Sequence, residues 1–249
     1  MEVHAHTHTP RKKWFHYFWE FFMLFLAVTL GFFVENQREH FIEDQREKKY
    51  AQSLYSDLKL DTARVSFIKS VKLWKGNKLD SLKSILTSVD MQKQSARAYY
   101  YTLFLNFNHK FYAQDATMQQ LRSSGSLRYF KDGELYNSIS QYYKMCSFYL
   151  DREMEQENQL LYPEELLSKI FDSRILMDNL IVKPNIWDNA KVPQGNPPLL
   201  TQDKQIINQY YLFIANKKWT NDVSLLFLSY IENNANQLMN MLRKEYRVE

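Results

Sequence analysis

Residues Trp14 to Val34, WFHYFWEFFMLFLAVTLGFFV, decide how the rest of the chain is organised. The uninterrupted apolar run within them, Phe21 to Val34, reaches only roughly 21 Å as a helix. A bilayer core of about 30 Å needs about 20 residues, so a spanning helix has to begin near Phe15. The stretch 14–34 therefore predicts one transmembrane helix that contains His16 and Glu20.

The ionisable groups of this stretch share one helical face with two small residues. Counting in helical steps from His16 reaches Glu20, Ala27 and Gly31. A carboxylate within hydrocarbon costs roughly 3 kcal/mol, and small residues one helical turn apart let two helices approach closely. We therefore expect a homo-oligomer joined through these four residues, or docking onto another membrane protein.

Two roles for His16 and Glu20 remain open. As a pair one turn apart they can fix the register of an oligomer through polar contacts between copies. They can also form an ion- or proton-coupled element, such as a ring around a pore. Polarity stops after Glu20 apart from Thr29, so the register role is favoured over conduction.

The residues flanking the apolar stretch predict its orientation. The basic trio 11–13 precedes it, and Trp14, Tyr17 and Trp19 resemble the aromatic belt of a membrane interface. We expect the N-terminus in the cytoplasm and the following domain in the periplasm. A cleaved export signal has a similar charge order, but no small-x-small site closes the run, so we expect no cleavage. Four basic residues after the span weaken the charge asymmetry: Arg38, Arg46, Lys48 and Lys49.

Composition excludes several classes of function. The chain has 249 residues, a net charge of +4 with both signs interspersed, only 5 Gly and a single Cys. A small net charge with both signs interspersed does not predict a basic surface that binds nucleic acid. A single cysteine cannot form an intramolecular disulfide. Beyond the span the only histidines are His40 and His109, and no catalytic or phosphate-binding motif occurs. We expect no enzyme activity and no cofactor.

Residues 1–13 are expected to form a cytoplasmic tail. They contain His4, His6 and His8, whose alternation would place three imidazoles on one side of an extended segment. Such a triplet can bind Zn²⁺, Cu²⁺ or Ni²⁺ weakly, more so where several copies meet. A polar tail without metal is the simpler interpretation.

The rest of the chain, 35–249, predicts an all-α extramembrane domain. Opposite charges at helical offsets follow the span, so the membrane helix is expected to continue as one rod to about Trp74 and to end at Gly76-Asn77. Apolar periodicity then predicts further helices that pack as a bundle. Those expected are 79–89, 92–111, 116–122, one capped by Asp132, one opened by Pro163 and one capped by Thr201, with an irregular proline-rich connector over 183–200.

One turn in this domain offers donors for a ligand. Backbone N–H groups and guanidinium groups can bind an anion or a peptide carboxylate. Helix termination at Gly125 alone explains the same sequence. The candidate residues are Arg122, Ser123, Ser124, Gly125 and Arg128.

Two other clusters have simpler structural interpretations. The aromatic run 99–111 can line a groove, but a helix apolar on most sides is typical of a bundle core. The acids Asp151, Glu153, Glu155 and Glu157 lie on a long polar stretch and are expected on a solvated face.

Two patterns carry a resemblance to a family. His6 to Phe32 reads H-x-H-T-x-R-K-K-W-x-H-Y-x-W-E-F-x-M-L-F-L-A-V-x-x-G-F, and Gln120 to Arg128 reads Q-L-x-x-S-G-x-L-R. The second pattern continues through Asp132, Leu135, Ile139, Tyr142 and Tyr143, so the two stretches together cover about a fifth of the chain. The sequence resembles an uncharacterised family of short bacterial inner-membrane proteins. The resemblance implies an inner-membrane location and a single-pass architecture, and it carries no activity.

The sequence thus predicts an N-terminally anchored, homo-oligomeric helical scaffold or sensor module. Its expected partners are the lipid bilayer and other copies of itself. An oligomeric channel that uses Glu20 and His16 in the membrane is the alternative. An enzyme would need a constellation assembled by the fold, which no spacing in the sequence reveals.

Overall fold

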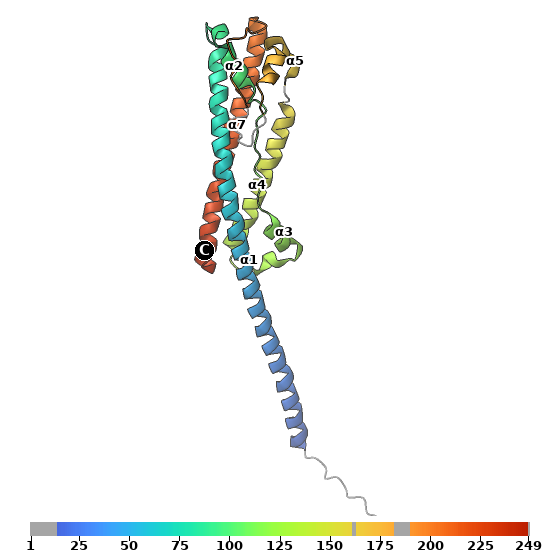
Figure 1. Ribbon diagram of the computed structural model, residues 1–249. Coiled ribbons are helices and arrows are strands. Elements are labelled where there is room, and N and C mark those ends of the chain that lie inside the picture. The colour runs from blue at the N-terminus through green and yellow to red at the C-terminus, as the bar shows by residue number, and fades with distance from the viewer. Residues whose placement is uncertain (1–13, 161–162, 182–189, 249) are drawn as a thin grey trace, which may run out of the picture. The chain divides into compact units, whose positions relative to one another are not determined.

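The computed structural model describes residues 14–160, 163–181 and 190–248 (Figure 1). Within these ranges the chain is helical and contains no strand, apart from an isolated bridge between Leu180 and Ala190. The predicted fold class is confirmed: a long N-terminal helix, apolar at its start, is followed by a helical bundle. The chain divides into two compact units, Met1–Tyr50 and Ala51–Glu249.

The first unit holds the beginning of α1, the helix Trp14–Leu86. Its apolar stretch 14–34 is exposed on every side, and of its large hydrophobic side chains only Leu26 is partly covered. The most apolar window has a mean hydropathy of 1.9, and none of it is buried. In the described part of the chain, α1 is thus the one helix long and apolar enough to span a membrane.

The second unit is built on three long helices: residues 51–86 of α1, α4 (Gly133–Gln159) and α7 (Lys204–Tyr246) (Figure 1). Ion pairs and hydrogen bonds fix their directions. Asp61 and Lys72 of α1 meet Tyr142 and Glu153 of α4 in the same order, so α1 and α4 run parallel. Contacts between α7 and α1 run in the opposite order, so α7 is antiparallel; they join Tyr55 to Arg243, Lys69 to Glu232, Lys72 to Asn221 and Asp80 to Lys218.

Apolar residues at helical spacing on each long helix fill the space between them. On α1 the buried series is Ala51, Leu54, Leu58, Val65, Ile68, Val71, Leu79 and Leu82. Near the end of α1 the core widens to receive four short helices and their connections. These are η1 (Met91–Gln94), α2 (Ser95–Thr102), α5 (Glu164–Ile170) and α6 (Ser173–Asp178), while α3 (Ala116–Ser123) and η2 (Ser126–Tyr129) precede α4.

Several predicted helix boundaries are confirmed. The Asp132 carboxylate accepts from the N–H groups of Glu134 and Leu135 and caps α4. Gly125 adopts φ 65°, the left-handed conformation expected of the residue that ends α3. Pro163 precedes α5, whose first turn carries the two glutamates that the helix dipole favours.

The predicted end of the first helix at Gly76-Asn77 is wrong. Helix α1 continues to Leu86, so the separate helix expected over 79–89 is its final part. A Cβ on Gly76 would lie 3.3 Å from Nδ2 of Asn221 on α7, tighter than an ordinary contact. Glycine is therefore found where two helices approach closely, and not where the helix ends.

The long helix expected over 92–111 is also wrong. Only α2, Ser95–Thr102, is α-helical, and the chain then turns. Thr102 is fully buried, and its hydroxyl pairs with that of Tyr210 at 2.7 Å. Beyond it, Phe104 packs edge-on against Trp74 with ring centroids 4.7 Å apart, so the aromatic residues reach the core without helical periodicity.

The predicted start of the last helix is displaced by two residues. Asp203 caps α7 by accepting from the N–H groups of Gln205 and Ile206, while the hydroxyl of Thr201 accepts from the N–H of Asp203. The preceding residues 190–200 are irregular, as expected of the connector 183–200. Residues 183–189 of that connector lie outside the described ranges.

Candidate ligand-binding cavity

A polar cavity of about 330 Å³ lies between the three long helices of the second unit. As far as the structure describes it, the wall combines charged side chains and side-chain amides with two apolar residues, Leu105 and Leu160. The charged residues are Lys72 and Lys75 of α1, Glu153 and Glu157 of α4, and Lys217 of α7. Each helix thus presents one or two ionisable groups to the same space.

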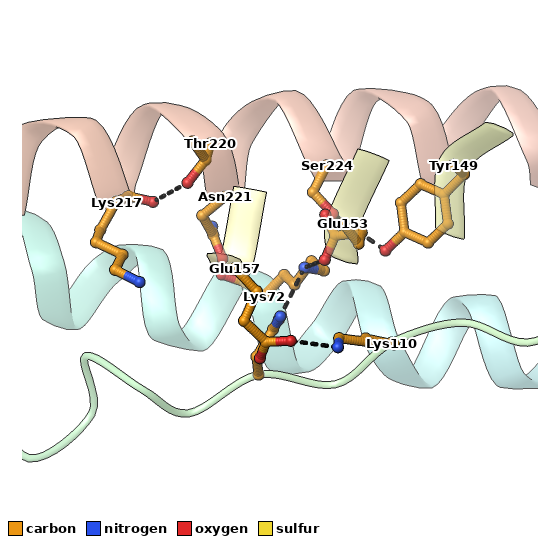
Figure 2. A network of polar contacts seen from close by, with 10 residues as sticks. Lys72, Lys110, Tyr149, Glu153, Glu157, Lys217, Thr220, Asn221 and Ser224 are labelled. Atoms are coloured by element: carbon orange, nitrogen blue, oxygen red, sulfur yellow. Dashed lines mark hydrogen bonds and ion pairs between the residues drawn. The ribbon is translucent and has the colours of Figure 1, made fainter. Parts of the chain in front are cut away.

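Lys72 and Glu153 form a buried ion pair on one wall (Figure 2). Nζ of Lys72 lies 2.9 Å from Oε2 of Glu153, and the side chains are 4% and 5% exposed. The same ammonium donates to Oδ1 of Asn108 at 3.2 Å. Burial lowers the pKa of Lys72, and the charge of Glu153 opposes that shift. Removing either partner would leave an uncompensated charge in the core.

Hydrogen bonds to α7 hold this wall in place (Figure 2). The Asn221 amide donates to the backbone carbonyl of Lys72 at 3.0 Å. The hydroxyls of Tyr149 and Ser224 are 3.1 Å apart and join α4 to α7 one turn from Glu153. Asn221 lines the cavity, whereas Tyr149 and Ser224 lie outside its wall and hold α4 and α7 together beside it.

Lys75 differs from its neighbours because no described residue hydrogen-bonds or pairs with its ammonium. The residue is 7% exposed and lines the cavity, yet its ammonium makes no hydrogen bond or ion pair with any residue that the structure describes. Burial is the main cause that lowers its pKa to about 7, and the nearby ammonium groups of Lys72 and Lys217 add to the shift. The cavity therefore contains an amine that titrates near neutral pH.

The remaining charges leave a cationic surplus. Glu157 pairs with Lys110, which comes from the irregular segment after α2 (Figure 2). Lys217 donates to the backbone carbonyl of Leu160 at 2.6 Å, and burial lowers its pKa. Both acids of the wall are thus paired, whereas Lys75 and Lys217 have no carboxylate partner among the described residues.

The sequence prediction for the acidic cluster on α4 is wrong at Glu153. Asp151 and Glu155 are exposed as expected, but Glu153 is buried against Lys72. A signal was present in the register: Glu153 continues the buried series Ile139, Tyr142, Cys146 and Tyr149, just as Lys72 and Lys75 continue the buried face of α1. Charged residues at core positions of two neighbouring helices mark the cavity.

At the predicted anion site the structure supports helix termination. Arg122, Ser123, Ser124, Gly125 and Arg128 are all exposed. The hydroxyls of both serines donate to the carbonyl of Gln120, at 3.1 and 2.7 Å, and so satisfy the end of α3. The guanidinium of Arg128 lies over the ring of Tyr129. A ligand at this turn stays a prediction.

The predicted oligomer face lies on the exposed start of α1. Nε2 of His16 is 3.1 Å from Oε1 of Glu20, so the expected contact between them is present. A Cβ at Gly31 would meet no atom within 4 Å, and Ala27 is exposed. The chain's own described residues do not cover this face. His4, His6 and His8 lie outside the described residues.

The aromatic run 99–111 contributes to the core, in agreement with the simpler interpretation. Tyr99, Tyr101, Phe104 and Phe111 are buried, and the aromatic members of the run do not line the cavity. Among residues 14–160, 163–181 and 190–248, no group of three His, Cys, Asp or Glu side chains is placed to hold a metal ion.

Comparison with known proteins identifies no relative. No protein-family model, no curated protein and no solved structure matches the chain. The resemblance to short inner-membrane proteins therefore stays a prediction, and function has to be inferred from the cavity and from the apolar start of α1.

Proposed function

We propose that this protein is a single-pass protein of the bacterial inner membrane that carries a helical ligand-sensing module in the periplasm. The observation that supports it best is the cavity between α1, α4 and α7, with one buried and unpaired ammonium in its wall. Helix α1 contributes both to this cavity and to the apolar stretch 14–34. A ligand in the cavity would therefore contact the same helix that enters the bilayer.

A passive scaffold accounts less well for Lys75. A buried ammonium without a partner is costly, and apolar packing would serve a scaffold better. Destabilising groups of this kind are typical of binding sites, where function opposes stability. The described residues of the cavity wall offer charged groups and side-chain amides that can hold a polar solute, and ligand binding is the proposed role.

The anchor is proposed to do more than hold the protein at the membrane. The face formed by His16, Glu20, Ala27 and Gly31 is proposed to join copies of the chain, and the basic residues 11–13 to keep the N-terminus in the cytoplasm. Conduction is the weaker alternative. The Thr29 hydroxyl donates to the carbonyl of Phe25, so it offers little polarity to a pore.

Self-association can be tested by the mass of the full-length protein in nanodiscs. Glu20→Gln keeps hydrogen-bonding capacity and should preserve most of the oligomer, whereas Glu20→Leu should weaken it by about 1 kcal/mol per interface. Gly31→Ile should disrupt assembly without changing charge. If all three variants assemble like the wild type, the face is not a self-association surface and Glu20 serves docking onto a different membrane protein.

A further inference from the structure

The size and lining of the cavity limit what it can hold. Ligand pockets commonly measure roughly 300 to 1,000 Å³, and this one, at about 330 Å³, is at the small end. Among the residues that the structure describes, its wall has two apolar members, Leu105 and Leu160, and offers the side-chain amides of Asn106 and Gln156. Such a lining suits a small solute that carries several hydrogen-bonding groups and disfavours an apolar ligand or a peptide.

The charges of the cavity wall indicate whether the ligand is an anion or a cation. Glu153 and Glu157 are already engaged by Lys72 and Lys110, so neither is free to attract a cation. Lys75 and Lys217 carry the surplus positive charge. An anion beside them would supply the partner that a buried ammonium lacks.

We propose that the cavity binds a small polar organic anion, whose carboxylate or phosphate group is held by Nζ of Lys75 with Nζ of Lys217 close by. The proposal deepens the sensing function above and rests on it. Hydroxyl groups of the ligand would meet the amides of Asn106 and Gln156. Carboxylate and phosphate are both oxyanions, and the choice between them is made by the probes below.

Binding is linked to protonation of Lys75. The charged groups around it are Lys72 on its own helix, Glu153 and Glu157 on α4, and Lys217 on α7; Glu157 is in turn paired with Lys110. With a pKa near 7, Lys75 is only partly protonated at neutral pH. An anion favours the charged amine, so binding takes up a proton and weakens as the pH rises above 7.

The test is calorimetry on the full-length protein in nanodiscs. The probes are malate, glycerol 3-phosphate and inorganic phosphate, with glycerol and putrescine as the neutral and cationic controls. The wild type should bind malate or one of the phosphates and neither control. Binding should be weaker at pH 8.5 than at pH 6.5, and repeating it in two buffers of different ionisation enthalpy should show proton uptake.

Two variants locate the site. Lys75→Met should weaken anion binding tenfold or more, because it removes a charged donor from a buried site. Lys217→Met should weaken it less and provides a second measurement if Lys75→Met does not fold. Lys59→Met is the matched control, since Lys59 is an exposed lysine of the same helix, outside the cavity, and should bind like the wild type.

Three results would overturn the proposal: no binding of any anion by the wild type, equal binding by Lys75→Met, or a preference for putrescine. These failures can be told apart from failure of the anchored module. A protein that stays in the membrane and assembles, yet binds no anion, refutes only the ligand. A protein that binds malate but washes off the membrane refutes only the anchor.

Discussion

Two stretches of one helix, 14–34 and 51–86 of α1, show how differently the same backbone can be used. In the first, large apolar side chains point in all directions and are exposed. In the second, apolar side chains recur every three or four residues and are buried, while the exposed face is mixed: it carries polar and charged residues together with Leu60, Phe67 and Leu73. A helix apolar on all sides without protein cover fits a lipid environment, and an amphipathic one fits a bundle.

The second stretch also departs from its own pattern at Lys72 and Lys75. Both lie on the buried face, one helical turn beyond Ile68 and Val71. The periodicity of each stretch thus indicates its surroundings, and two of the polar exceptions, Lys72 and Lys75, lie in the wall of the cavity. Asp61, a third buried charge on this face, lies outside the cavity and is held by Tyr142 and Gln114.

The largest effect should come from placing a carboxylate in each stretch. Leu58→Asp buries a charge at a side chain that is 0% exposed, so it should destabilise the bundle by at least about 4 kcal/mol or prevent folding. Leu24 is exposed in the apolar stretch, so Leu24→Asp should leave the melting temperature of the bundle unchanged. It should reduce membrane insertion, because the added carboxylate raises the free energy of insertion by roughly 3 kcal/mol. If Leu24→Asp inserts normally, the stretch does not cross a bilayer.

The next largest effect concerns the buried ion pair at the cavity wall. Glu153→Gln leaves the ammonium of Lys72 without a counter-charge and should cost about 3 kcal/mol in the free energy of unfolding. Glu165→Gln removes an equally short but exposed pair with Lys169 and should leave the denaturation midpoint nearly unchanged. Equal effects of the two variants would show that Lys72 and Glu153 are not desolvated.

Lys75 should leave a signature in the pH dependence of stability. Its pKa in the folded protein is about 7, below the 10.5 of a solvated lysine, so between these pH values the unfolded chain binds more protons. Stability should therefore rise with pH, by roughly 1 kcal/mol per unit from this residue. Denaturation of Lys75→Met between about pH 7 and pH 8.5 should show a smaller slope and a more stable protein at pH 7. The lowered pKa values of Lys72 and Lys217 act in the same direction and keep some slope.

The smallest effect is expected at a turn outside both stretches of α1. Gly125→Val places a β-branched residue at φ 65° and should destabilise the bundle by about 1 kcal/mol or more. A Cβ at this position would meet no atom within 4 Å, so the cost comes from the backbone and not from a clash. Gly133→Ala, at a helical glycine that is also open to solvent, is the control and should be neutral or stabilising.

Most of the fold could be predicted from the sequence because its signals are local. The apolar stretch 14–34, the cap at Asp132 and the left-handed turn at Gly125 depend on residues close in the chain. The errors lie where distant residues decide the outcome. The pair Gly76-Asn77 reads locally as the end of a helix. The close approach of Gly76 to Asn221 on α7, which explains the glycine, cannot be read from neighbouring positions.

The cavity could not be predicted for the same reason. Lys72, Glu153 and Lys217 are far apart in sequence, and only the arrangement of the three helices brings them together. The register of Lys72 and Glu153 on the buried faces of their helices is the available signal, but the polar residues around Glu153 favour a solvated interpretation of it. The unpaired state of Lys75 depends on which neighbours are already engaged, which only the three-dimensional contacts reveal.

The proposed topology, with a cytoplasmic N-terminus and a periplasmic bundle, can be tested by labelling introduced thiols in spheroplasts with a membrane-impermeant maleimide. Cys146, the single native thiol, is buried and should stay unreactive. The thiol of Asn137→Cys, at an exposed position of α4, should react in intact spheroplasts, and that of Thr7→Cys only after lysis. Labelling of position 7 but not position 137 in intact spheroplasts would contradict the proposed orientation. Release of the protein from the membrane by alkaline carbonate would contradict the transmembrane anchor.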